Sequence, residues 1–546
     1  MTEPVLFTGG PIRLTVGEDP AAETPPALLV QDGRVRGVGT VAELRSLAAC
    51  APREVDLDGR ALLPGFVDAH AHTLLHGSGV DWVDLSDAKT IDDIVDRLAR
   101  RAEQSPTGAI RGYGYDQSRL VQRRHPTAAD LDRVSTTRPV QIQHASGHGY
   151  VVNSVVLRES GITTATPTPV GGRIDRDAAG NPVGVVFDSA CDLLTGPDGV
   201  KVGNHGPNFH LPMSDDEVAR LFDLGQRSFL EAGITTICDA QVTELEMAAY
   251  LRARDAGRLR MRAHLLYLSS KLDGLRHLGL VSRLGDEQLE LHGVKLYADG
   301  SVIARTAYLG AHDCCGTPSP RGYLYHEPKE LVELITTAHR LGLRTATHAQ
   351  GEVPIGLVLD AVEQARASDP RPGLRHRIEH CGFPTDEQVA RMARLGVVPV
   401  PQPMQVHLYA DSLIEEFGEY GGRFYPYGAF ERAGVPVVIS SDAPVTMPGP
   451  LKAAWAAVTR RTTGGATAGG GQQGVSRSAA LRGITETPAA LLDRPDIGAL
   501  RVGARADLVI VDVDPVTAPL EALATAAVTE TWVGGERVWS RQEGMA

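Results

Sequence analysis

The stretch that decides the fold is LLPGFVDAHAH, residues 62–72. An apolar run is interrupted at Pro64-Gly65 and ends in His70 and His72. Because side chains of a β-strand repeat their direction every two residues, both imidazoles point to the same side. Two imidazoles that converge at a strand end suit the binding of a divalent metal ion. Two unrelated polar residues give the same spacing, so the rest of the chain has to decide.

Downstream of this stretch, short apolar runs alternate with amphipathic segments. The segment 214–233, for example, begins with Ser214 and Glu217 in the spacing of a helix capping box. We predict strands over residues 62–68, 234–239, 261–267, 291–297, 343–348, 375–380, 397–400 and 436–441. Strands that alternate with helices indicate parallel β/α units. The predicted fold is therefore α/β, with a closed (β/α)8 TIM-like barrel over residues 62–497.

Two further regions lie outside this pattern. Residues 1–61 and 498–546 contain short β-type runs, and we expect them to form one composite β-sandwich domain, because chain ends often lie close together. The chain between the first and second barrel strands is much longer than a crossover needs. Residues 80–210 are therefore predicted as an inserted subdomain after barrel strand 1. Segments over the C-terminal mouth of a barrel shape the substrate pocket.

Composition narrows the classes of partner. The chain has 546 residues, 42% of them hydrophobic and 22% charged, and a net charge of −13. This acidic balance predicts neither a nucleic-acid partner nor a membrane partner. We see no signal-like segment and no long apolar run. The six cysteines lack C-x-x-C spacing, which favours a reducing compartment, and we expect a cytoplasmic protein.

Metal-binding side chains end several predicted strands. They are His70 and His72 on the first strand, Lys295 on the fourth, His348 on the fifth, His380 on the sixth and Asp442 after the eighth. Each alone has an ordinary structural explanation: a hydrogen-bonded histidine, a solvated lysine or a helix cap. However, the C-terminal strand ends of a barrel meet at one mouth, and convergence from five strands favours a functional site.

The order His-x-His, Lys, His, His, Asp resembles the ligand order of the amidohydrolase superfamily. The surrounding sequence is similar to its family 3, which includes N-substituted formamide deformylases and exoenzyme-type hydrolases. The motifs that carry this resemblance are LLPGFVDAHAH, GYGYDQ, GHGYVVNSVVL, GVKLYADGS, THAQGE, RIEHC and SSDAPV. The resemblance covers essentially the whole chain and implies a barrel plus a β-sandwich made from both ends.

The resemblance implies a pair of zinc ions. It assigns His70, His72 and Asp442 to one metal, His348 and His380 to the other, and a carboxylated Lys295 to the bridge between them. It also implies that Asp442 is catalytic as the acceptor of a proton from water, and that His148 is catalytic as a stabiliser of the oxyanion. One metal with an unmodified Lys295 is the alternative.

The predicted function is metal-dependent hydrolysis of a C–N amide bond in a small molecule of the N-acyl or N-formyl amine type. A deaminase or a cyclic-amide hydrolase on the same scaffold is one alternative, and a non-catalytic binding relative is an alternative of another class. The predicted substrate contacts are Tyr113, Asp116, His148, Asn153, Asp299 and Arg305. The resemblance is also compatible with a homodimer.

Overall fold

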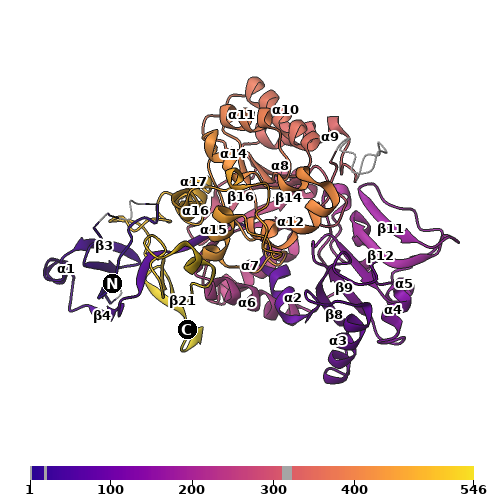
Figure 1. Ribbon diagram of the computed structural model, residues 1–546, viewed down its shortest axis with the longest axis horizontal. Coiled ribbons are helices and arrows are strands. Elements are labelled where there is room, and N and C mark those ends of the chain that lie inside the picture. The colour runs from indigo at the N-terminus through magenta and orange to yellow at the C-terminus, as the bar shows by residue number, and fades with distance from the viewer. Residues whose placement is uncertain (1–2, 18–20, 22, 310–321, 546) are drawn as a thin grey trace.

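The computed structural model describes residues 3–17, 21, 23–309 and 322–545. A parallel barrel occupies the middle of the molecule in Figure 1. Sheets built from the two chain ends lie on one side of it, and a sheet inserted after the first barrel strand lies on the other. No helix in the described part of the chain has the length and apolar character needed to cross a bilayer.

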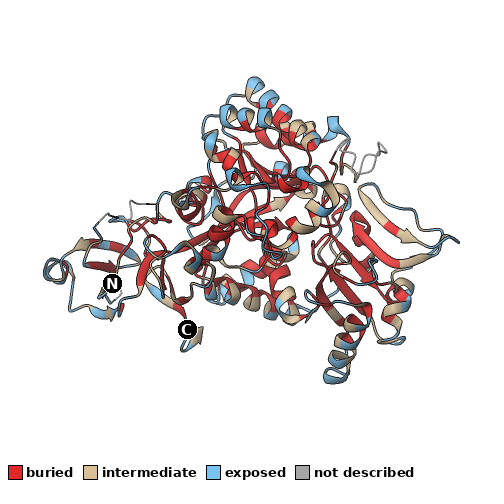
Figure 2. Cartoon of the chain, viewed as in Figure 1, coloured by how far each residue is buried: buried red, intermediate tan, exposed pale blue. Residues whose placement is uncertain are grey.

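The barrel is a nearly closed sheet of parallel strands in the order β19-β18-β17-β16-β14-β13-β6. The strands are β6 (Phe66–Ala71), β13 (Ile234–Val242), β14 (Arg262–Leu268), β16 (Leu289–Tyr297), β17 (Arg344–Ala349), β18 (Arg377–His380) and β19 (Val398–Val400), and the short β15 (Leu284–Gly285) pairs antiparallel with β16. Every residue of β13 and β16 is buried, as in a parallel sheet covered on both faces (Figure 2).

The eighth predicted strand, residues 436–441, does not form regular strand structure. Its backbone forms a hydrogen bond outside the barrel sheet instead, because the N–H of Ile439 donates to the carbonyl of Gly483 at 2.9 Å. The segment still completes the barrel beside β6, because the N–H of Asp442 donates to the carbonyl of His70 at 2.8 Å. Seven regular strands and one irregular segment thus replace the eight regular strands that the sequence predicts.

The deciding stretch also differs from the single strand predicted over residues 62–68. It forms two strands, β5 (Ala61–Pro64) and β6, which belong to different sheets. Gly65 joins them, and a Cβ atom at this position would lie only 2.3 Å from the side-chain oxygen of Thr235. A glycine at this point lets the chain pass close to β13 as it changes sheets.

Helices cover the outside of the barrel and connect its strands (Figure 1). They are α2 (Thr73–Asp81), α6 (Asp215–Glu231), α7 (Glu244–Asp255), α8 (Leu272–Leu278), α9 (Pro328–Arg340), α10 (Glu352–Ser368), α11 (Asp386–Leu395), α12 (Pro403–Phe417), α13 (Glu419–Gly422), α14 (Tyr427–Arg432), α15 (Pro450–Thr459), α16 (Arg477–Arg482) and α17 (Glu486–Leu491). As its sequence predicts, α6 begins after Ser214, whose side chain accepts a hydrogen bond from the N–H of Glu217.

The two chain ends supply two sheets. The first has the order β3-β2-β1-β4 and the second β23-β22-β21-β20-β5. Their elements are β1 (Val5–Thr8), β2 (Ala27–Gln31), β3 (Arg34–Gly39), α1 (Val41–Leu47), β4 (Arg53–Asp56), β20 (Leu508–Val511), β21 (Val528–Val533), β22 (Glu536–Ser540) and β23 (Gly544–Met545). One apolar cluster contains residues of both sheets, with Phe7 packed edge-on against Trp532.

The chain between β6 and β13 carries a six-stranded sheet in the order β11-β12-β10-β9-β8-β7. Its elements are β7 (Val83–Asp84), α3 (Ile91–Gln104), β8 (Ile110–Tyr115), α4 (Ala128–Asp132), β9 (Val140–His144), β10 (Gly149–Val152), α5 (Ser154–Glu159), β11 (Gly172–Arg176) and β12 (Pro182–Asp188). This sheet has an apolar cluster of its own, to which α3 contributes Ile91, Ile94 and Leu98.

Candidate metal centre

His70, His72 and Asp442 meet where β6 ends. His70 is the second-last residue of the strand, and His72 occupies the N-cap position of α2. The Nε2 atom of each histidine lies 3.3 Å from Oδ1 of Asp442. Asp442 has a φ of 55°, a left-handed conformation that is uncommon for a residue with a side chain. Such a conformation is typical of functional sites, where the surrounding structure holds it in place.

His348 and His380 approach the same point from β17 and β18. Their ring centroids are 4.5 Å apart, and those of His70 and His380 are 4.9 Å apart. Ligand atoms of His70, His380 and Asp442 all lie within 4.8 Å of one another. We call His70, His72, Lys295, His348, His380 and Asp442 the mouth cluster. The structure therefore brings together the residues that the sequence places at separate strand ends.

Three imidazoles of the mouth cluster are oriented by hydrogen-bond acceptors. The Nδ1 atom of His70 bonds to a carboxylate oxygen of Glu379, and Nδ1 of His380 lies 2.7 Å from Oε1 of Gln402. The Nε2 atom of His348 lies 3.0 Å from the carbonyl of Gly300. Because each acceptor requires an N–H on that side of the ring, the other ring nitrogen keeps a lone pair. This is how metal-binding histidines are usually held.

Protonation states match this orientation. Burial lowers the pKa of His72 to about 4 and that of His380 to about 3, and it holds the pKa of His348 well below its usual value. For Asp442, burial acts to raise the pKa, but the adjacent rings of His70 and His72 outweigh burial and keep the pKa well below its usual range. The site thus offers neutral imidazoles and a carboxylate, which are the donor types that zinc prefers.

Lys295 lies fully buried on β16 beside these ligands. Its Nζ atom has no hydrogen-bond partner among the described residues and lies 4.6 Å from the ring centroid of Tyr297. Burial lowers its pKa to about 8, against the opposing effect of the nearby Glu379. A buried ammonium without hydrogen bonds is costly, so this amine requires another partner or another chemical form.

Two buried carboxylates that the sequence analysis missed support the ligands. Glu379 lies on β18 between Arg377, with which it forms a buried ion pair, and His70. Asp68 accepts hydrogen bonds from the N–H groups of His70 at 3.1 Å and Ser441 at 3.2 Å, and so joins β6 to the irregular eighth segment. The sequence does hold a signal for them. Each is a charged residue two positions from another polar residue of the same buried strand, and side chains with this spacing point to the same side.

His148 directly precedes β10 and lies beside the mouth cluster. Its ring centroid lies 5.5 Å from that of His348, and its Nδ1 lies 2.6 Å from Oδ1 of Asp188. Asp188 also accepts hydrogen bonds from the hydroxyls of Tyr323 and Tyr325. With Nδ1–H donated to this fixed carboxylate, Nε2 is the free ring nitrogen of His148. Asp188 is a third residue that sequence reasoning missed, because it lies 40 positions from its partner.

Comparisons with known proteins identify the family of the chain. A model described as the amidohydrolase family matches residues 53–539. The chain belongs to the amidohydrolase family. It is 30% identical over 521 residues to an N-substituted formamide deformylase of Arthrobacter pascens, covering 93% of this chain and 94% of the relative.

Solved structures give the same result. An uncharacterized metal-dependent hydrolase of Pyrococcus horikoshii has a TM-score of 0.76 and 25% identity, over 95% of this chain and 99% of its own. A similar hydrolase of Pyrococcus furiosus has a TM-score of 0.72 and 26% identity, over 94% and 100% of the two chains. Together with the family match, these similarities identify the amidohydrolase as a hydrolase.

Three of the predicted substrate contacts, Tyr113, Asp116 and Arg305, have different surroundings within the amidohydrolase. Tyr113 lies in β8 and is buried; burial raises its pKa well above the usual value, with smaller contributions from Tyr409 and Asp442. Asp116 accepts a hydrogen bond from the N–H of Ser118 at 2.8 Å. Arg305 forms an ion pair with Glu416. None of these contacts tests the predicted role of the three residues in binding substrate.

Asn153 and Asp299, which are also predicted to contact substrate, form hydrogen bonds within the protein, and their contact with substrate stays a prediction. The side chain of Asn153 caps α5 by accepting from the N–H of Val156, and its amide group donates to the carbonyls of Ser135 and Arg138. Its hydrogen-bonding groups are therefore directed at backbone. Asp299 accepts from the N–H groups of Tyr308, Gln350 and Gly351, and burial raises its pKa to about 8. It anchors the loop that follows His348.

Proposed function

We propose that this amidohydrolase hydrolyses a C–N amide bond of a small molecule at the mouth cluster, with the help of bound divalent metal. The observation that carries the proposal is the grouping of His70, His348 and His380, whose rings are neighbours and each keep one ring nitrogen free of the outer hydrogen-bond partner. The printed name of the Arthrobacter pascens relative supports an N-formyl or N-acyl amine as the substrate class.

The residues present fit a pair of zinc ions. In the proposal, His70, His72 and Asp442 would hold one ion, and His348 and His380 would hold the other. Lys295 would serve both ions as a carbamate ligand, formed when the neutral amine adds carbon dioxide and releases a proton. The orphaned Nζ atom supports this modification, because a carbamate replaces a partnerless buried cation by a bidentate oxygen ligand.

The chain's own residues then move protons and stabilise charge. Bound metal would lower the pKa of water and polarise the substrate carbonyl. Asp442 accepts the proton of the attacking water and delivers it to the departing nitrogen. With its Nδ1–H held by Asp188, His148 takes a second proton on Nε2 and, as an imidazolium, donates it to the carbonyl oxygen on which negative charge develops. Tyr113, Asp116 and Arg305 contact the remainder of the substrate.

The proposal also covers the domains, the partners and the location of the protein. Residues 1–61 and 498–546 act as one composite β-sandwich domain, residues 62–497 as the barrel domain, and residues 80–210 as the inserted subdomain that shapes the pocket through His148. The amide substrate is the only partner class that we propose besides a second copy of the chain in a homodimer, and the proposed location is cytoplasmic.

A substrate screen tests the proposed reaction. Zinc-loaded protein is incubated with N-formyl amines, N-acyl amines, cyclic amides and amino-substituted heterocycles, and the release of amine, carboxylate and ammonia is measured. We expect amine and carboxylate in equal amounts from the first two classes. Ammonia from heterocycles would replace the proposal by a deaminase, and ring opening would replace it by a cyclic-amide hydrolase. No turnover of any class would favour a non-catalytic binding protein.

A further inference from the structure

A second group of metal-binding side chains lies at the opposite end of the barrel. It consists of His264 on β14 and of Glu290 and His292 on the neighbouring β16, and we call it the base cluster. All three residues lie in the N-terminal halves of their strands, whereas Lys295 of the mouth cluster lies further along β16. In barrels of this type the N-terminal end contributes stability, and the C-terminal end carries the chemistry.

Strand pairing brings the three side chains together. His264 and Glu290 are direct neighbours across the parallel pair β14–β16. The register then shifts, so that Leu265 pairs with Leu291 and Leu266 with Gly293, which leaves His292 as an extra residue of β16. Such a bulge redirects a side chain. The two rings lie edge to face with centroids 5.7 Å apart.

The distances suit a single metal ion. Oε1 of Glu290 lies 3.7 Å from Nδ1 of His264 and 3.6 Å from Nδ1 of His292. Ligand atoms of the three residues all lie within 4.8 Å of one another. Ligands about 2.0 Å from a tetrahedral zinc ion are separated by roughly 3.3 Å. The side chains are therefore slightly too far apart for hydrogen bonds and close to the separation that a shared cation imposes.

The polar atoms of the base cluster have no hydrogen-bond partners. Both ring nitrogens of His264, both of His292 and Oε1 of Glu290 are buried and unpartnered within the described ranges. Both histidines are fully buried, and Glu290 is 6% exposed. Buried polar groups in proteins are nearly always paired, so the orphaned Nδ1 atoms of both rings beside the orphaned Oε1 of Glu290 indicate a missing common partner. Burial lowers the pKa of His292 to about 3 and also lowers that of His264, which leaves both rings neutral.

Neighbouring arginines do not neutralise Glu290. Each of them has a carboxylate of its own: Arg262 pairs with Asp507, Arg344 with Asp493, Arg377 with Glu379 and Arg494 with Asp496. The only ion-pair partners of Glu290 in the described part of the chain are the two imidazoles. A buried carboxylate between two neutral rings is unfavourable unless a cation joins them.

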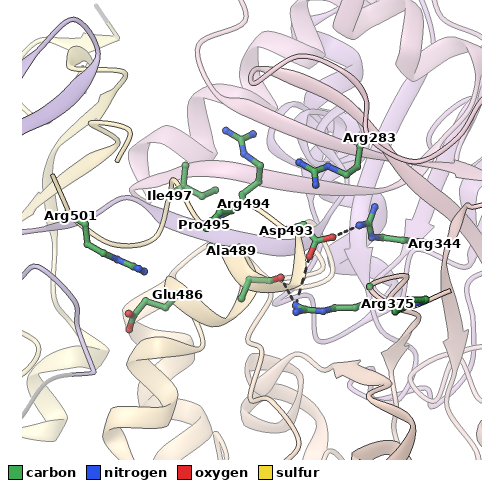
Figure 3. A pocket seen from close by; sticks show the side chains of 13 residues that line it. Arg283, Arg344, Arg375, Glu486, Ala489, Asp493, Arg494, Pro495, Ile497 and Arg501 are labelled. Atoms are coloured by element: carbon green, nitrogen blue, oxygen red, sulfur yellow. Dashed lines mark hydrogen bonds and ion pairs between the residues drawn. The ribbon is translucent and has the colours of Figure 1, made fainter. Parts of the chain in front are cut away.

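A cavity of about 680 Å³ has Arg344, Asp493 and Arg494 in its walls (Figure 3). Burial is the main cause of the lowered pKa values of His292 and His264. The charge of Arg344 lowers the pKa of His292 further, and the charge of Arg494 lowers that of His264 further. Two residues of the cavity wall therefore lie near the base cluster.

We propose that the base cluster binds one divalent metal ion, with zinc favoured by two imidazoles and a carboxylate. His264, Glu290 and His292 supply three ligands, and a fourth position is left for water or for the second oxygen of Glu290. The ion links β14 to β16 across the bulge and serves the stability of the barrel. This proposal does not rest on the proposed function, because none of the three residues belongs to the mouth cluster.

Metal content tests the proposal. The wild type and the variants Glu290→Gln and His264→Gln are loaded with zinc, and loosely bound ions are removed. The number of zinc ions per chain is then measured by elemental mass spectrometry. The matched control is His376→Gln, which removes a buried imidazole that is hydrogen-bonded to His339. We expect both cluster variants to hold one zinc fewer per chain than the wild type, and the control to hold the same number. Equal zinc in the wild type and Glu290→Gln would overturn the proposal.

A second measurement needs no substitution. Crystals of the zinc-loaded wild type are measured on both sides of the zinc absorption edge. An anomalous peak between His264, Glu290 and His292 is expected whether or not the mouth cluster is filled. Absence of that peak in crystals that show zinc elsewhere in the molecule would overturn the proposal, even if the cluster variants fail to fold.

Discussion

The two ends of the barrel hold similar side chains in different surroundings. At the mouth, imidazoles and a carboxylate converge from separate strands, and outer partners such as Glu379 and Gln402 fix the rings. At the base, His264, Glu290 and His292 come from two adjacent strands and have no outer hydrogen bonds among the described residues. Imidazole rings that are held by hydrogen bonds suit a site that must position reacting groups. A closed group of ligands without such support suits an ion that only holds strands together.

The largest difference between the two ends should be seen when one carboxylate is neutralised at each. Asp442→Asn removes the proposed proton acceptor at the mouth, so turnover should fall by about three orders of magnitude. The matched variant at the base is Asp493→Asn, whose carboxylate pairs with Arg344. It should keep turnover within about twofold of the wild type. Initial rates of amine release at saturating zinc provide the measurement. Similar rates for Asp442→Asn and the wild type would exclude Asp442 as the proton acceptor.

A smaller effect is expected from the inserted sheet. His148→Gln should lower kcat by about 100-fold, because it removes one donor to the developing oxyanion. Asp188→Asn leaves the ring in place but weakens its orientation, so the loss should be in the same direction and smaller. His125→Gln, in the same inserted region and hydrogen-bonded to Tyr115, is the control. If His148→Gln retains the wild-type kcat, the oxyanion role is wrong.

The smallest effect concerns acid stability. In the folded chain burial lowers the pKa of His292 to about 3, whereas an unfolded histidine titrates near 6.5. Between these values the unfolded chain binds a proton that the folded chain does not, so the free energy of unfolding falls as pH falls from 6.5 toward 3. Each pKa unit corresponds to about 1.4 kcal/mol at most.

Urea unfolding of metal-stripped protein at several pH values between 6.5 and 4.5 measures this dependence. His292→Gln removes one titrating imidazole, so its unfolding midpoint should change less with pH than that of the wild type. The same loss of stability with acid in both proteins would contradict the assignment of a neutral, buried His292.

Sequence reasoning reached the barrel and the mouth cluster because both leave local patterns. His70, Lys295 and His380 are polar residues at or near the ends of apolar runs, and parallel strands bring such ends together. The eighth strand could not be predicted correctly, because its backbone bonds to Gly483 depend on a distant segment. The change of sheet at Gly65 is likewise set by contact with Thr235.

Outer partners were harder to predict. Glu379 and Asp188 act across long stretches of sequence, and the cap that Asn153 forms on α5 was not predicted. The base cluster was missed for a related reason. The i, i+2 spacing of Glu290 and His292 is visible in the sequence, but their approach to His264 depends on the register of β14 and β16 and on one bulge.

The central claim is that catalysis depends on metal held at the mouth of the barrel. Its most direct test is a zinc titration of chelator-stripped protein, with amine release from an N-formyl amine and bound zinc measured at each step. The account predicts no turnover in the stripped protein and a return of full turnover as zinc fills the mouth cluster. Full turnover in the stripped protein, with no zinc bound, would contradict it.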